Sequence, residues 1–475
     1  MPSLTLQRLT VRLFNTLTRS VVEFVPLDPA GKQVGMYCCG PTVYDFGHIG
    51  NFRTFVFSDL VRRYLEFRGF NVRHVMNITD VEDKIITRVR EAKVPLREYT
   101  GKFENAFLED LKALNCLSPH HLPRATEHIP EMIGIIDKLL QRGIAYRAPD
   151  GSVYFSISKY QEAGCRYGQL AHIDFEQMRP GERVRSDEYT KDSVADFALW
   201  KARVPEDGDV FWPAPWGEGR PGWHIECSAM SMKLLGTSFD LHLGGEDLVF
   251  PHHEDEIAQS EGATGKPFVK HWLHGAHLLV EGKKMSKSLG NFFTIRDLLA
   301  KGYSGREIRF LLLKGHYRET FNFTIEGLDE ARSALGRLDE CLGKLQELFG
   351  SQSAQPDPSL VQRFTEAMDE DLNVSAGWAV VFDWVRDMNR ALASGQMNAG
   401  QAAANLAGWQ KIDSVFAVSK KQESEAPPEI VKLLDDRQAA RKAKDFKRAD
   451  VLRDELKAKG WVIEDTPKGP RLKRL

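Results

Sequence analysis

Apolar and polar positions near the N-terminus alternate in a way that predicts a strand, a loop, a helix and a second strand. Val34–Cys39 is a short apolar run of the kind found in buried strands. After the loop Pro41–Gly50, apolar residues recur at helical spacing over Phe57–Leu65, and Gly69 supplies a helix stop. Asn71–Ile78 then resumes with β-branched residues. This order predicts the opening half of a parallel nucleotide-binding sheet.

The pattern then changes and predicts an insertion between two halves of the sheet. Thr126–Arg142 has helical spacing, and Tyr146–Ile157 resembles a hairpin that turns at Asp150-Gly151. The Trp-, Pro- and Gly-rich stretch Phe211–Trp223 leads the chain back to the sheet. The candidate strands of the second half are Phe239–Leu243 and His277–Val280.

Beyond Asn291 the pattern is almost entirely helical. Thr294 with Asp297 forms a capping-box pattern, and Ser304 can cap the next helix. Ser375 is expected to cap a later helix. The apolar face of that later helix is Trp378, Val381, Phe382 and Val385.

Two linkers separate the last parts of the chain. Phe349–Leu360 is rich in Ser, Gln and Pro, and Ala417–Pro428 is charged and ends in two prolines. Two basic helices and a small hairpin, Trp461–Leu472, are expected after them. We predict an α/β fold class: a Rossmann-like parallel-sheet catalytic domain split by an insertion, then helical domains and a small mixed α+β C-terminal domain. The expected segments are 1–120 (first sheet half), 121–210 (insertion), 211–300 (second half), 301–348 (helical stem-contact region), 349–420 (helical bundle) and 427–475 (basic C-terminal domain).

Composition narrows the class of protein only slightly. Hydrophobic residues at 42%, charged residues at 27% and a net charge of −2 are ordinary values for a soluble chain. Glu429–Leu475 holds 14 Lys and Arg against 9 Asp and Glu. That excess suits a phosphate backbone, although a solvated helical face explains it equally well. Six scattered cysteines, no leader in Met1–Thr18 and no membrane-length apolar run predict a reducing cytoplasm.

The loop Tyr44–Asn51 carries the first candidate chemistry. It lies between a strand and a helix start, where free backbone N–H groups and the helix dipole favour phosphate. Gly47 and Gly50 allow close backbone approach, and His48 can donate to a phosphate oxygen. A His-Ile-Gly tripeptide alone is weak evidence, because such a tripeptide is more often an ordinary turn.

The second element is Lys284-Met-Ser-Lys287-Ser288, whose two lysines can neutralise a triphosphate. Alone it would be a solvated surface loop. In this order, the two elements resemble the paired motifs of class I aminoacyl-tRNA synthetases.

A third group of residues has the composition of a metal site. His252 and Glu256 are four apart, so on a helix they share one face and can converge on a cation. Thiolates from Cys227 and Cys39 would complete a sulfur, nitrogen and oxygen set that suits zinc. The same His/Glu spacing also occurs on exposed polar helix faces.

Four blocks of sequence resemble the cysteinyl-tRNA synthetase family. They are Met36–Asp45, Asn77–Asp80 with Asp83-Lys84, Pro221–Met230 and Gly244–Glu254. The resemblance implies one zinc per chain. Its implied ligands are Cys39, Cys227, His252 and Glu256. It also implies that ATP, with Mg²⁺, is bound by His48, Gly50, Asn51, Lys284 and Lys287, of which His48 and the two lysines act in catalysis. The implied cysteine-binding residues are Gly40, Thr42, Thr79, Trp223 and Asp247.

Two positions qualify the resemblance. Asn51 stands where many class I enzymes have a second histidine, and an amide can donate but cannot carry positive charge. Cys38 is expected to point to the opposite face of its strand from Cys39, so it is left out of the ligand set.

The resemblance implies a reaction and its partners. L-Cysteine would attack the α-phosphorus of ATP, and the adenylate would pass to the 2′-OH of the terminal adenosine of tRNA(Cys). Zinc would separate cysteine from serine, because a soft thiolate binds zinc far better than an alcohol does. We expect a cytoplasmic monomer without a membrane partner. The alternatives are a mycothiol-type ligase joining cysteine to an amino sugar, which lacks the C-terminal segment, and a non-catalytic RNA-binding paralogue.

Overall fold

The computed structural model describes residues 10–173, 196–286, 290–349, 354–420, 427–466 and 469–474. The chain divides into two compact units, Met1–Val418 and Ser419–Leu475.

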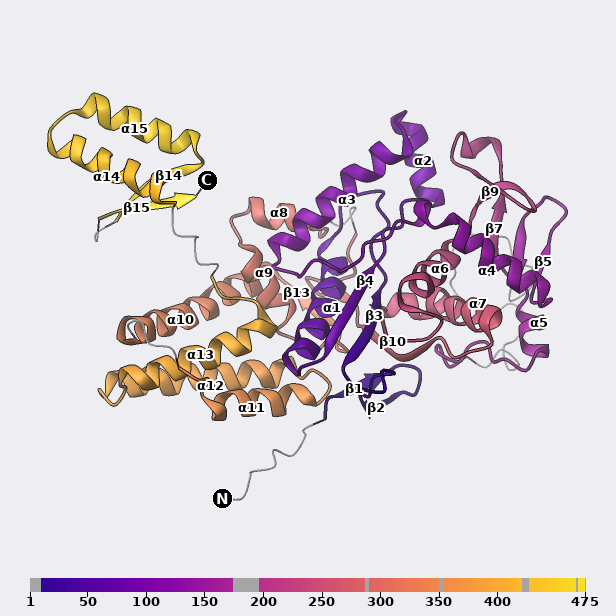
Figure 1. The fold of residues 1–475 in the computed structure, drawn as a ribbon, viewed down its shortest axis with the longest axis horizontal. Helices are drawn as coiled ribbons and strands as arrows, with labels where there is room; N and C mark the ends of the chain where they lie inside the picture. The colour runs from indigo at the N-terminus through magenta and orange to yellow at the C-terminus, as the bar shows by residue number, and fades with distance from the viewer. Residues whose placement is uncertain are drawn as a thin grey trace, which may run out of the picture. The chain divides into compact units, whose positions relative to one another are not determined.

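A four-stranded parallel sheet forms the centre of the larger unit (Figure 1). Its strands, in spatial order, are β11 (Val269–Gly275), β10 (Phe239–Gly245), β3 (Gln33–Cys38) and β4 (Asn71–Met76). Helix α1 (Ile49–Phe67) connects β3 to β4, which confirms the predicted β-loop-α-β unit. The two halves of the sheet meet where β3 pairs with β10. In such sheets the crevice beyond the carboxyl ends of the strands, where the order reverses, is the usual ligand site.

The second half of the sheet differs in part from its prediction. Phe239–Leu243 lies within β10 as expected, but the partner strand is β11, which the sequence pattern did not reveal. β12 (Leu278–Val280) pairs with β13 (Phe321–Phe323) in a separate two-stranded sheet, so the assignment of His277–Val280 to the central sheet is wrong. β11 does not have the apolar pattern of a buried strand, because it contains polar residues such as His271 and His274. Both of these side chains are nevertheless buried.

The insertion is built on a five-stranded antiparallel sheet. Its order is β5 (Ala145–Arg147), β6 (Val153–Phe155), β7 (Phe197–Ala202), β9 (Gly217–Pro221) and β8 (Trp212–Ala214). The β5–β6 pairing confirms the predicted hairpin, and α4 (Ile129–Gln141) confirms the preceding helix. Because β8 and β9 belong to this sheet, the insertion extends past its expected end at residue 210, to Pro221.

The remaining elements of the first 300 residues surround these sheets. Strands β1 (Arg12–Asn15) and β2 (Ser20–Glu23) form an N-terminal hairpin. The helices are α2 (Asp83–Ala92), α3 (Leu96–Ala113), α5 (Ile157–Glu162), α6 (Trp223–Leu235) and α7 (Glu254–Thr264). Short turns are η1 (Ala125–Glu127), η2 (Pro205–Asp207), η3 (Glu246–Leu248) and η4 (Val249–His253), which is kinked at the extended residue Phe250.

Helices account for almost all of the described chain between Thr294 and Val418, as predicted. They are α8 (Ile295–Ala300), α9 (Gly305–Leu312), α10 (Ile325–Phe349), α11 (Pro358–Asp369), α12 (Val374–Ala393) and α13 (Ala399–Phe416). The capping box of Thr294 with Asp297 is present, and the Ser304 side chain caps α9.

The expected cap of α12 is wrong. Asn373 caps this helix, with its Oδ1 accepting from the N–H of Ala376 at 3.0 Å. The hydroxyl of Ser375 instead donates to the carbonyl of Lys314 at 3.2 Å. The predicted apolar face is otherwise confirmed, since Trp378, Val381 and Val385 are buried and Phe382 is half-buried.

Two hydrophobic cores lie on opposite faces of the central sheet. One includes Cys38, the apolar face of α1 and the helices after residue 294. The other includes Cys39 and the insertion. Neighbouring residues of β3 therefore face different cores, which confirms that Cys38 points away from Cys39.

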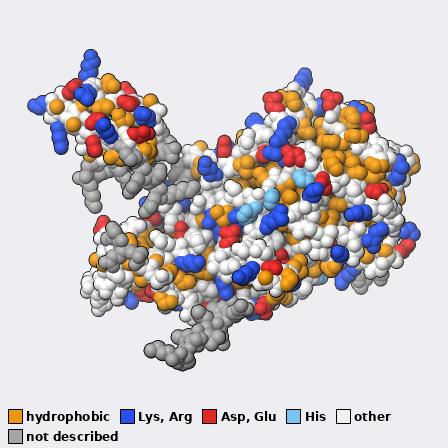
Figure 2. Space-filling view, viewed as in Figure 1, with side chains coloured by type: hydrophobic (Ala, Val, Ile, Leu, Met, Phe, Trp, Pro, Cys, Tyr) orange, Lys and Arg blue, Asp and Glu red, His pale blue; other side chains and the backbone are white. Residues whose placement is uncertain are grey.

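The smaller unit has the predicted two helices and hairpin. α14 (Pro428–Lys442) and α15 (Phe446–Ala458) precede β14 (Trp461–Thr466) and β15 (Gly469–Arg474), which pair antiparallel. Ile430, Leu456 and Trp461 form its core. Lys and Arg side chains stand at its surface beside hydrophobic ones (Figure 2). In the described parts of both units, no helix is both long enough and apolar enough to cross a membrane.

Candidate functional site

Four metal-ligating side chains converge beyond the carboxyl end of β3. Cys39 follows β3, Cys227 lies on α6, His252 lies in η4 and Glu256 lies on α7. The two Sγ atoms are 3.8 Å apart, and Sγ of Cys39 lies 3.7 Å from Oε1 of Glu256. Nε2 of His252 lies 3.2 Å from the same oxygen. The four ligand atoms all lie within 4.8 Å of one another, so the predicted set comes together in space.

Burial controls the charge of these side chains. All four are buried. Burial raises the pKa of Glu256 and, with help from Cys227, that of Cys39 well above their ordinary values. Burial lowers the pKa of His252 well below its ordinary value, which leaves an imidazole lone pair free to bind a cation. A buried group of two thiols, one neutral imidazole and one carboxyl, with no Lys or Arg among its four members, fits a metal cation.

A shell of histidines supports the cluster and was not predicted from the sequence. Nδ1 of His224 lies 2.9 Å from Nδ1 of His252, and Nε2 of His242 lies 2.9 Å from Oε2 of Glu256. Nε2 of His253 lies 3.3 Å from Sγ of Cys39. Cys39, His242, His253 and Glu256 form a second, overlapping group with ligand atoms within 4.8 Å. The dense histidines between residues 224 and 274 were the available signal, but only the folded chain shows which of them meet.

Residues predicted to bind the substrate amino acid lie on the segments around this cluster. The indole of Trp223 stacks on the His252 ring, with centroids 4.3 Å apart. Thr42 and Thr79 form an isolated parallel bridge between the segments that follow β3 and β4. Gly40 must be glycine, because a Cβ there would clash with the carbonyl oxygen of Asn77.

The predicted phosphate-binding elements meet at the start of α1. His48 is the N-cap residue of this helix, and Asn51 completes the capping box. Burial lowers the pKa of His48, while the negative charge of Asp247, on η3 after β10, opposes that shift. The imidazole is thereby favoured in its neutral form, with Nδ1 accepting from the N–H of Asn51 at 3.1 Å. The remaining ring nitrogen, Nε2, is then the one that carries a proton and can donate.

The second motif approaches the same helix start. A Cβ on Gly50 would lie 2.9 Å from Cε of Met285, so the segment beginning at Lys284 reaches the His-Ile-Gly motif. The N–H of Ile49 donates to the carbonyl of Phe293 at 2.9 Å. Lys284 is exposed, and Lys287 lies outside the described residues.

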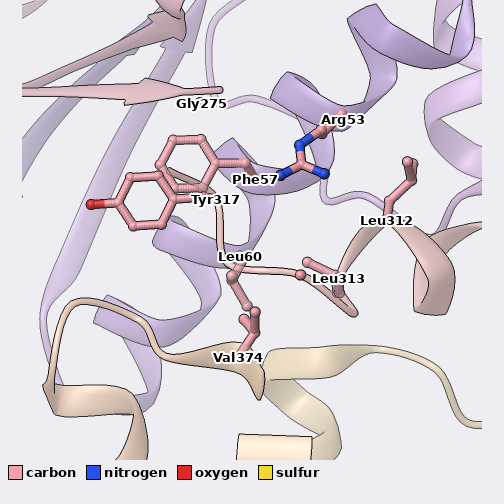
Figure 3. A pocket seen from close by; sticks show the side chains of 9 residues that line it. Arg53, Phe57, Leu60, Gly275, Leu312, Leu313, Tyr317 and Val374 are labelled. Carbon is pink, nitrogen blue, oxygen red and sulfur yellow. The ribbon is translucent and has the colours of Figure 1, made fainter. Parts of the chain in front are cut away.

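A separate, narrow pocket is lined by residues of α1 and of the segments around Leu312 and Tyr317 (Figure 3). Arg53 faces it together with Phe57, Leu60 and Tyr317, and the remaining walls are mostly aliphatic. None of the described residues predicted for catalysis or binding lines this cavity, so we do not assign it to the reaction.

Comparisons with known proteins agree with this geometry. Residues 24–333 match the family of tRNA synthetases class I (C) catalytic domains, and residues 363–418 match the DALR domain. Residues 423–470 match the cysteinyl-tRNA ligase anticodon binding domain. The cysteine–tRNA ligase of Chlamydia muridarum (strain MoPn / Nigg) is 47% identical over 98% of this chain and 99% of its own length. The chain belongs to the cysteine–tRNA ligase family.

Other relatives give the same result. The cysteine–tRNA ligase of Protochlamydia amoebophila (strain UWE25) is 44% identical over 99% of both chains. The methionyl-tRNA synthetase of Mycobacterium tuberculosis, solved in complex with methionyl-adenylate, is 14% identical with a TM-score of 0.58. That match covers 82% of this chain and 90% of the other, and it shows a shared class I synthetase fold. The predicted family and α/β fold class are therefore confirmed.

Proposed function

We propose that this member of the cysteine–tRNA ligase family activates L-cysteine with ATP and transfers it to the terminal adenosine of tRNA(Cys). The observation that carries the proposal is the placement of Cys39, Cys227, His252 and Glu256 at the same sheet edge as His48. One group fits a soft metal that selects a thiol, and the other lies at a helix start, which favours phosphate. The first group would select cysteine, and the second would hold ATP for its activation.

The sulfur, nitrogen and oxygen donors of this cluster suit one zinc ion per chain. When bound, zinc would hold the side chain of cysteine as a thiolate, a bond that serine forms poorly. Trp223, stacked on His252, would pack against the substrate side chain beside it. Gly40, Thr42, Thr79 and Asp247 would complete the cysteine pocket.

Adenylate formation joins the cysteine carboxylate to the α-phosphorus of ATP and releases pyrophosphate. The chain contributes mainly positioning and charge stabilisation. Nε2–H of His48 would donate to a phosphate oxygen, with the backbone of Gly50 and Asn51 at the helix start. Lys284 and Lys287 would neutralise the leaving pyrophosphate together with Mg²⁺.

The smaller unit and the helices after residue 294 would hold the RNA. Residues 423–470 match an anticodon binding domain, which a ligase acting on an amino sugar would not require. The side chain of Phe446, at the start of basic α15, is exposed and can stack on an unpaired base. The match favours tRNA as the acceptor, and the catalytic-domain match argues against an RNA-binding paralogue without catalysis.

Two assays of the full-length chain test the proposal. ATP–pyrophosphate exchange should depend on cysteine and should fail with serine, and charging should require tRNA(Cys). Exchange without tRNA charging, but with cysteine transfer to an amino sugar, would support the ligase alternative. Absence of exchange in zinc-replete protein would contradict the proposal.

A further inference from the structure

The side chain of Asn291 joins the two described sides of the Lys-Met-Ser-Lys-Ser segment. Its Oδ1 accepts from the N–H of Ser286 at 2.9 Å. Its Nδ2 lies 3.2 Å from the carbonyl oxygen of Lys284 and 3.3 Å from that of Val280, and donates to both. A side-chain amide supplies an acceptor and two donors at once, a combination that no carboxylate or aliphatic side chain offers. One side chain therefore fixes the backbone on both sides of Met285.

The same segment is in contact with the start of α1 at two places. Met285, between the two residues that Asn291 holds, reaches Gly50. Phe292, the neighbour of Asn291, lies edge-on to the His48 ring, with centroids 5.4 Å apart and an interplanar angle of 88°. The residues on either side of the Asn291 hydrogen bonds, Met285 and Phe292, therefore both contact the His-Ile-Gly motif.

We propose that Asn291 is a positioning residue for adenylate formation, holding the backbone of Lys284–Ser286 against the His48 end of α1. The inference rests on the proposed function. Asn291 acts through Lys284, whose backbone it holds beside the contact of Met285 with Gly50, without touching substrate. The side chain of Lys284 is exposed and has many rotamers, so the position of its backbone decides how often its charge reaches ATP. A displacement of about 1 Å at a positioning group can cost about 10²-fold in rate.

The chain offers a matched control. Oδ1 of Asn322, an exposed residue of β13, accepts from the N–H of Gly282 at 2.7 Å. That bond ties β13 to the turn just before Lys284 but does not touch Lys284–Ser286. Asn322→Ala therefore removes a comparable side-chain-to-backbone bond close by and leaves the proposed contact intact.

Single-turnover adenylate formation, with purified full-length zinc-bound protein, tests the inference. Asn291→Ala should slow this step by about tenfold or more, while the KM for cysteine changes less than about twofold. Asn291→Asp should be at least as slow, because its carboxylate would face the two carbonyl oxygens. Asn322→Ala should retain the wild-type rate. Equal slowing by both alanine variants, or an unchanged rate in Asn291→Ala, would overturn the inference.

Double substitution shows whether the effect passes through Lys284. If it does, the variant carrying Asn291→Ala and Lys284→Ala should be no slower than Lys284→Ala alone, within about threefold. Losses that multiply would refute action through Lys284. A wild-type chain that forms no adenylate would refute the proposed function itself, so the two failures are distinguishable.

Discussion

His48 and Asn51 cap the start of α1 reciprocally. The N–H of Asn51 donates to Nδ1 of His48 at 3.1 Å, and the N–H of His48 donates to Oδ1 of Asn51 at 3.0 Å. Asn51, which stands where many class I enzymes have a second histidine, thus has its carbonyl oxygen engaged in the capping box. His48 has two separable roles, a cap through Nδ1 and a candidate phosphate donor through Nε2.

Substitutions at His48 should separate these roles. His48→Ala should lose the cap, at about 1 kcal/mol of stability, and slow adenylate formation by about 10²-fold or more. Asn is among the best capping residues but is too short to donate from the position of Nε2, so His48→Asn should keep near-wild-type stability and remain slow. Thermal unfolding and single-turnover kinetics measure the two effects. Full activity in the asparagine variant would leave His48 with the capping role alone.

Zinc content should depend on Cys227. Chelator-washed wild-type protein should hold nearly one zinc per chain, and Cys227→Ser should lose most of it, because an alcohol is a poor zinc ligand. Elemental analysis and cysteine binding check this. Cys38→Ser is the matched control, since Cys38 faces the other core and should retain zinc. A Cys227→Ser variant that kept its zinc and its cysteine affinity would remove Cys227 from the ligand set.

Lys287 should matter in the transition state more than in substrate binding. If it contacts charge developing on pyrophosphate, Lys287→Ala should lower kcat for activation by about 10²-fold, near 2.7 kcal/mol, with little change in the KM for cysteine. Lys287→Arg should recover only part of the rate, because a planar guanidinium is shaped differently from an ammonium. Zinc content and thermal stability should stay near wild type. An unchanged single-turnover rate in Lys287→Ala would make this lysine a surface residue.

Removing the chain from Pro428 onward should separate the two half-reactions. The smaller unit has its own core, so the larger unit should fold and form adenylate without it. Charging of tRNA(Cys) should fall sharply, because the basic helices that we expect to contact RNA phosphates are lost. Pyrophosphate exchange and charging measured on the same preparation give the comparison. Parallel loss of both would show that the tail is needed for folding of the larger unit.

Asp110, on α3, should make stability depend on pH. Its side chain is buried, which raises its pKa to about 6, although Arg296 at 3.3 Å opposes the shift. An unfolded Asp titrates near about 3.9, so the folded chain binds this proton more tightly, and stability falls as pH rises through that window. Asp110→Asn should therefore stabilise the larger unit at pH 7 relative to wild type, with the advantage gone by about pH 4.

Thermal unfolding between pH 4 and pH 8 tests the Asp110 prediction. Glu109→Gln is the control, because it also removes a negative charge beside Arg296 but from an exposed side chain. Glu109 lies 2.6 Å from the same guanidinium. A stability difference between wild type and Asp110→Asn that does not change with pH would contradict it.

The sequence by itself determined the elements whose signals are local. The apolar run of β3 and the 3.6-residue spacing of α1 predicted the first half of the sheet. Residue type and spacing also predicted the helix caps at Thr294 and Ser304. Short motifs in a fixed order predicted the family, because the resemblance depends only on residue identity and spacing. Cys39, Cys227, His252 and Glu256 could be named as one group on that basis.

Tertiary structure decided what depends on contacts distant in the chain. β11 contains buried histidines, so its sequence has the hydropathy of a polar segment although the strand lies in the core. β12 pairs with β13, and a pairing between segments about 40 residues apart leaves no local pattern in the sequence. Ser375 and Asn373 are both good caps by type, and the local backbone selected Asn373. His242 and His253 lie against Cys39 and Glu256, and Asn291 joins the two sides of its segment, because packing brought together groups that no local pattern connects.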